Sequence, residues 1–235
     1  MRLALIAAFC ALTSPIFCQP VANRIEPSRR IAHFQVQDQN MIDALLQLGQ
    51  QEEFGVGIDY IDAAAFERKL SISTRDSTLA SVLDQITKEL GYKWSVQGRA
   101  INVTHPGAIV GKRNLLNTRI RHFKVDPMPL EQAGCQLAIA FKFAMNPKMK
   151  GLAGDCLFAG IEQRIDGVEM NGSTVREILN ALVSQHGNGA WVVQQPSWTM
   201  NKDLGFGVWK LLAYGRADGR YSRMLQVRGL GLTAH

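Results

Sequence analysis

A repeated pattern is the feature that most constrains how this chain can fold. The segment DSTLASVLDQITKELGYKWSV (Asp76–Val96) recurs in outline as GSTVREILNALVSQHGNGAWVV (Gly172–Val193). Each copy has a threonine suited to cap a helix, apolar residues at three- and four-residue steps, and then a glycine and a strand-like run. Four residues recur at an offset of 96: Ser77, Thr78, Leu83 and Gly91 become Ser173, Thr174, Leu179 and Gly187. The repeat predicts a helix followed by a strand in both places.

The repetition extends upstream at a different offset. HFQV (His33–Val36) returns as HFKV (His122–Val125), 89 residues later. A helix follows each: Asn40 is the expected cap of the first, and Pro129 the entry to the second. The two offsets differ by seven (96 − 89), so about seven extra residues lie between Phe143 and Asp166 of the second copy.

Strand patterns fill the remaining positions of both copies. They lie at Phe54–Tyr60, Leu70–Thr74, Tyr92–Val96, Ile101–His105, Gly167–Met170 and Ala190–Gln195. The expected fold class is therefore α+β, with two tandem small units. Each has a β-α-β plus β-α-β-β arrangement, in which two helices pack against small sheets. The two units span residues 31–106 and 118–195, and residues 107–117 form the linker between them. Residues 196–235 form a C-terminal strand and a loose tail.

The N-terminus is typical of an exported protein. Arg2 precedes an apolar run from Leu3 to about Leu12, which is too short for the roughly 20 residues of a membrane span and fits a secretory signal peptide. We expect a signal over residues 1–22, and cleavage after Cys18 or after Ala22 both fit. A buried N-terminal helix is the alternative. No later segment is long and apolar enough to cross a membrane.

Two of the four cysteines remain once the signal is removed. In an oxidising compartment, Cys135 and Cys156 are predicted to form a disulfide that ties the extra loop to its own unit. Closing a loop of that size contributes roughly 3 kcal/mol in the chain-entropy model. Two unpaired buried thiols are the alternative.

Catalytic and cofactor signatures are lacking in the sequence. The five histidines have no metal-ligand spacing, so we expect no metal, no cofactor and no enzyme activity. Five carboxylates near strand ends show no convincing pairing and are expected to be solvated: Asp59, Asp62, Glu67, Asp166 and Glu169. The net charge of +6 is spread along the chain, and we expect a solvated basic surface rather than a nucleic-acid site.

The first unit resembles the secretin and TonB short N-terminal domain family. The segments that carry the resemblance are FQVQDQNMIDALLQLGQQEEFGVGIDY and LSISTRDSTLASVLDQITKELGYKWSVQGRAINV, within residues 31–106. The second unit resembles it only in its latter half, MNGSTVREILNALVSQHGNGAWVV. The resemblance implies a periplasmic protein-docking module, as found ahead of outer-membrane secretin channels and TonB-dependent receptors. No pore or β-barrel pattern follows here, so only docking is carried over.

The expected function is therefore that of an exported docking or adaptor module of the cell envelope. We place it in the periplasm of a Gram-negative bacterium, in association with the outer membrane. Its expected partners are envelope proteins, namely an outer-membrane channel, a receptor or an inner-membrane regulator, bound by edge-strand pairing. The candidate partner contacts are Trp94, Tyr92, Arg99, Trp191, Trp209 and Tyr214. A soluble structural or assembly component of a secretion or pilus machine is the alternative, and an enzyme or small-ligand binder comes third. The oligomeric state is left open.

Overall fold

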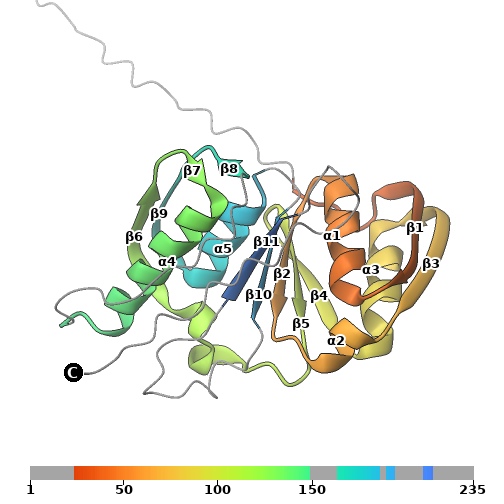
Figure 1. The fold of residues 1–235 in the computed structure, drawn as a ribbon, viewed down its shortest axis with the longest axis horizontal. Coiled ribbons are helices and arrows are strands. Elements are labelled where there is room, and N and C mark those ends of the chain that lie inside the picture. The colour runs from red at the N-terminus through yellow and green to blue at the C-terminus, as the bar shows by residue number, and fades with distance from the viewer. Residues whose placement is uncertain (1–23, 149–162, 186–188, 194–208, 214–235) are drawn as a thin grey trace, which may run out of the picture.

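The chain forms a stack of layers built around one central sheet (Figure 1). The computed structural model describes residues 24–148, 163–185, 189–193 and 209–213. A five-stranded sheet lies in the middle, two long helices pack on each of its faces, and a two-stranded sheet covers each helix pair from outside. The α+β prediction is confirmed.

The first unit supplies one half of this stack. Its elements are β1 (Arg30–Gln39), α1 (Met41–Glu52), β2 (Gly55–Asp59), α2 (Ala63–Glu67), β3 (Leu70–Thr78), α3 (Leu79–Thr87), β4 (Lys93–Gln97) and β5 (Ala100–Thr104). Strands β1 and β3 form the outer antiparallel pair, whereas β2, β5 and β4 belong to the central sheet. A hydrophobic core fills the space between them around α1 and α3.

The second unit repeats the plan on the other side. Its elements are β6 (Arg119–Val125), β7 (Met128–Pro129), α4 (Leu130–Met145), β8 (Arg164–Ile165), β9 (Val168–Thr174), α5 (Val175–Val183), β10 (Gly189–Val193) and β11 (Trp209–Ala213). Strands β6 and β9 form its outer antiparallel pair, β7 pairs with β8, and β10 and β11 join the central sheet. A second core lies around α4 and α5.

The N-terminal helix caps expected at Asn40, Thr78 and Thr174 are present, whereas Gly187, expected to end the last helix, lies outside the described residues. The side chain of Asn40 accepts a hydrogen bond from the backbone N–H of Asp43, and that of Thr78 from Ser81. Thr174 and Glu177 form a reciprocal capping box at α5. These bonds satisfy backbone donors that the first turn of a helix leaves without partners.

The two copies also agree in strand register. Arg30 pairs with Thr78 in the first copy, and Arg119 pairs with Thr174 in the second. The same bond follows in each: Arg30 donates to the carbonyl of Asp76, and Arg119 to the carbonyl of Gly172. The structural repeat therefore reaches individual hydrogen bonds.

One feature of the central sheet was not foreseen, namely that both units contribute to it. Its strand order is β11-β10-β2-β5-β4, and β10 of the second unit runs parallel to β2 of the first. The side chains of β10 alternate between the two cores: Ala190 and Val192 enter the first, whereas Trp191 and Val193 enter the second. Because β10 is buried on both faces, it belongs to both cores, and the core of the first unit is completed by two residues of the second.

Candidate functional site

The junction between the units depends on two glycines of β2. Gly55 and Gly57 face the second unit, whereas Val56 and Ile58 between and after them enter the first core. A Cβ atom on Gly57 would lie 2.3 Å from Cζ2 of Trp191, and one on Gly55 would lie 2.7 Å from the hydroxyl of Ser184. The missing side chains therefore let Trp191 and the end of α5 approach the sheet closely.

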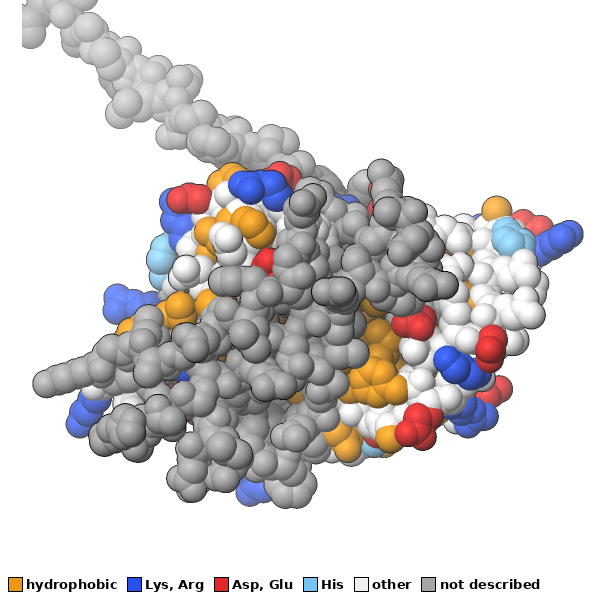
Figure 2. All heavy atoms as spheres, viewed as in Figure 1, with side chains coloured by type: hydrophobic (Ala, Val, Ile, Leu, Met, Phe, Trp, Pro, Cys, Tyr) orange, Lys and Arg blue, Asp and Glu red, His pale blue; other side chains and the backbone are white. Residues whose placement is uncertain are grey.

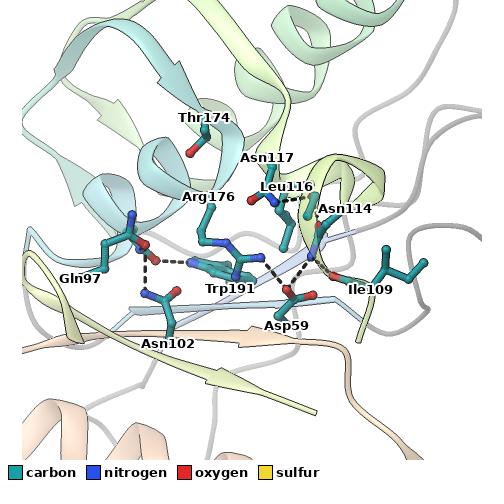
Figure 3. Close-up of polar contacts among 12 residues, drawn as sticks. Asp59, Gln97, Asn102, Ile109, Asn114, Leu116, Asn117, Thr174, Arg176 and Trp191 are labelled. Carbon is teal, nitrogen blue, oxygen red and sulfur yellow. Dashed lines mark hydrogen bonds and ion pairs between the residues drawn. The ribbon is translucent and has the colours of Figure 1, made fainter. Parts of the chain in front are cut away.

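A chain of amide groups lies beside this contact (Figure 3). The indole N–H of Trp191 donates to Oδ1 of Asn180 at 2.7 Å, and Nδ2 of Asn180 donates to Oε1 of Gln97 at 3.0 Å. Nδ2 of Asn102 donates to the same oxygen at 3.3 Å. Because an indole nitrogen can only donate, it sets the direction of the whole chain. The amide nitrogen of Gln97 is thereby left with no partner in the described part of the molecule.

A buried carboxylate ties the two units and their connection together (Figure 3). Oδ2 of Asp59, at the end of β2, accepts bonds from the guanidinium of Arg176 on α5 and, at 2.8 Å, from Nδ2 of Asn114. Nδ2 of Asn114 also donates to the carbonyl of Ile109 at 2.8 Å. The side chains of Asp59 and Arg176 are 8% and 16% exposed. The expectation that Asp59 is solvated is wrong, because a cation from a helix more than a hundred residues away covers it.

A groove opens at the edge of this junction, between the β4–β5 turn and α5. It has a volume of about 370 Å³ and is lined on one side by Gln97, Gly98 and Arg99. Met170 and the α5 residues Glu177, Asn180, Ala181, Ser184 and Gln185 line the other side. Oε2 of Glu177 is engaged by the backbone and hydroxyl of Thr174. The exposed guanidinium of Arg99 has no such partner among the described residues, so the hairpin side of the groove is rich in free donors.

Strand β4, next to the groove, forms one edge of the central sheet, and β11 forms the other. The N–H of Gly55 bonds the carbonyl of Arg99, and the N–H of His105 bonds the carbonyl of Asp59, so odd-numbered residues of β5 face β2. The even-numbered residues of β5 therefore bond Lys93, Ser95 and Gln97 of β4. The backbone groups of Trp94 and Val96 consequently point outward, away from the sheet.

A compact polar cluster closes the opposite end of β5. Nδ1 of His105 accepts from the N–H of Gly107 at 2.8 Å, and Nε2 lies 3.3 Å from Oδ2 of Asp62. Tyr92 donates its hydroxyl proton to the other oxygen of Asp62 at 3.0 Å, and the ring of Tyr60 meets His105 edge-on. Burial raises the pKa of Tyr92 far above its ordinary value. Both imidazole nitrogens are engaged, so this cluster holds β5 against α2 and presents no free base.

The predicted partner contacts fall into three groups. Trp191 is wholly buried and Tyr92 is only 4% exposed, so the prediction that they contact a partner is wrong. Trp191 lies on β10, which is buried on both faces, and Tyr92 packs into the core of the first unit. Trp94 is half-buried and donates its indole N–H to Asp84 at 2.7 Å, whereas Arg99 is exposed at the groove. The side chain of Trp209 and all of Tyr214 lie outside the described residues.

The cysteine prediction is only partly visible. Cys135 on α4 is disulfide-bonded. Cys156 lies outside the described residues, so its pairing with Cys135 stays a prediction. Within residues 24–148, 163–185, 189–193 and 209–213, no group of three or more His, Cys, Asp or Glu side chains could hold a metal ion. No helix in the same ranges is long and apolar enough to span a bilayer.

Comparison with known proteins finds no relative of this chain. No family model matches the chain, and neither the curated proteins nor the solved structures contain a match. The function must therefore be argued from the geometry of the chain itself.

Sequence reasoning missed the groove and the junction behind it. Gln97 and Asn180 carry no pattern of their own, since their role depends on contact between two units. The alternation of glycines with apolar residues in FGVGIDY was an available signal. It marks a strand face that is approached closely by other atoms.

Proposed function

We propose that this chain is an exported protein-docking module of the bacterial cell envelope, related to the secretin and TonB short N-terminal domains. It binds an extended segment of an envelope partner as an added strand on β4. The single observation that carries this proposal is the outward backbone of Trp94 and Val96 on the last strand of a five-stranded sheet. Backbone N–H and C=O groups that have no partner among the described residues are a template for strand addition.

Strand β4 suits this role better than the outer strands of the first unit. Its pairing with β5 is regular from Lys93 to Gln97. The β1–β3 pair instead shifts register between Val36 and Gln39, near Asp38 with its positive φ of 55°. Bulges and twists of this kind discourage further pairing. The β4 edge also lies beside the groove, which offers room for side chains of a bound segment.

The test is site-specific photo-crosslinking in intact Gram-negative cells that express the full chain. A photoreactive residue replaces Ser95 on β4, and a matched variant carries it at Gln35 on β1, which is also exposed. The proposal expects a discrete crosslink to an envelope protein from position 95 and not from position 35. Equal crosslinking from both positions, or none from position 95, contradicts docking at β4.

The alternative role in an assembly predicts self-association. Sedimentation of the purified chain as a defined ring or higher oligomer would favour a structural component of a secretion or pilus machine. Sedimentation as a monomer that binds one extended segment favours the adaptor role.

A further inference from the structure

The β4–β5 hairpin carries cations and no acid. From Lys93 to Thr104 its charged residues are Lys93 and Arg99, and the segment has no Asp or Glu. Both cations are exposed, and neither has an ion pair among the described residues. On the face of the first unit seen in Figure 2, acidic and basic side chains are interspersed, and Arg68 pairs with Glu89 at 2.7 Å. The β4–β5 hairpin therefore carries a net positive charge.

The side chains of β4 divide into two chemically different rows. Trp94 and Val96 pack against the core of the first unit. Lys93, Ser95 and Gln97 alternate with them, so this second row points to the other face of the sheet, where Gln97 lines the groove beside α5. A strand added to β4 must alternate in the same way, with one row beside apolar side chains and one beside polar and cationic ones.

The groove end of the polar row offers donors to a ligand. The direction of the amide chain from Trp191 leaves Nε2 of Gln97 without a partner among the described residues, and Arg99 stands two residues further along the turn. Glu177 also borders the groove, but Oε2 of its carboxylate is engaged with Thr174 at the start of α5. Free amide and guanidinium donors are best matched by the oxygens of a carboxylate.

We infer that the segment bound by β4 is an extended peptide with carboxylates at alternate positions. Its acidic side chains face α5, where they meet Lys93 at one end and Arg99 with Gln97 at the other. Its apolar side chains lie on the opposite face beside Trp94 and Val96. This inference rests on the proposed docking at β4 and adds the chemistry of the partner.

The experiment uses the purified full chain and three fluorescein-labelled synthetic decapeptides. The peptides alternate valine with glutamate, with glutamine or with lysine, and binding is followed by fluorescence anisotropy at low and at physiological salt. Two exposed ion pairs predict about tenfold tighter binding of the glutamate peptide than of the lysine peptide, and a smaller difference at higher salt. The double variant Lys93→Glu/Arg99→Glu is expected to prefer the lysine peptide.

Two further variants separate this inference from the proposed function. Val96→Pro removes an outward N–H and blocks the free edge, while the ladder bonds to β5 remain. Val96→Ala makes a comparable loss of packing but keeps the N–H. The expected result is loss of peptide binding only in Val96→Pro.

The outcomes then divide cleanly. If all three peptides bind equally and Val96→Pro abolishes binding, docking at β4 stands and the carboxylate preference is overturned. If no peptide binds, or if binding survives Val96→Pro, docking at β4 is overturned and the inference falls with it.

Discussion

The contact between Gly57 and Trp191 supports a quantitative prediction about the junction of the units. In Gly57→Ala, the new methyl carbon would lie 2.3 Å from Cζ2 and 2.4 Å from Cε2 of Trp191. Ordinary carbon–carbon contacts are about 3.5–4.0 Å, so the ring must move by more than about 1 Å. That movement is resisted because the ring is wholly buried and its N–H is bonded to Asn180.

The expected cost follows from two opposing effects. Overpacking of a tight core costs about 1–3 kcal/mol, and the size of this clash places it near the upper end. Replacing glycine also lowers the conformational entropy of the unfolded chain, which stabilises the folded protein by about 0.4–1 kcal/mol. Gly57→Ala should therefore lower the free energy of unfolding by roughly 2 kcal/mol.

Urea unfolding followed by circular dichroism measures this change, and the double variant Gly57→Ala/Trp191→Leu tests its cause. Trp191→Leu alone is destabilising because it removes buried ring surface and the bond to Asn180. Its cost should be smaller by at least about 1 kcal/mol in the Gly57→Ala background, because the smaller leucine side chain also relieves the clash there. A Gly57→Ala protein as stable as the parent, or additive effects in the double variant, would refute a close approach of Trp191 to β2.

Three further predictions concern polar contacts. Asp59→Ala should cost about 3–5 kcal/mol in urea unfolding, because it leaves Arg176 buried without its counter-charge, and the added change Arg176→Met should recover part of that loss. The free energy of unfolding should fall as pH rises above about 10, since the unfolded chain then releases the Tyr92 proton that the folded chain retains. Tyr92→Phe should flatten this part of a pH–stability curve measured by thermal melting. An unchanged slope would contradict the raised pKa of Tyr92. Thr174→Ala should cost about 1 kcal/mol by loss of the capping box, and Thr174→Ser, which keeps the hydroxyl, should remain close to the parent.

Local structure was predictable because short-range physics decides it. The caps at Asn40, Thr78 and Thr174 depend on bonds that span three residues. The register of the outer strand pairs follows from the same repeat, since the apolar face of each must cover its own helices. The two units and their α+β character could therefore be recognised from spacing alone.

The candidate site was less accessible to the same reasoning. Arg99 was predicted to contact a partner, which stays a prediction, and the structure places it exposed at the border of the groove. Trp191 was predicted to contact a partner but is buried. A large aromatic residue in a short strand has the same local sequence pattern whether its side chain faces solvent or a second core. The burial of Asp59 was missed because its partner, Arg176, lies on a different unit.

The division between sequence and tertiary structure follows from the range of the interactions. The sequence alone determined that two similar α+β units exist, where their helices begin, and which residues are apolar. Only the tertiary structure decided that β10 pairs with β2, that Gly57 of β2 faces Trp191, and that β4 forms an edge of the central sheet among the described residues. A strand pattern specifies which faces are buried, but its hydrogen-bonding edges are chemically the same for every neighbour. The neighbour is therefore chosen by the packing of whole units, which no local pattern records.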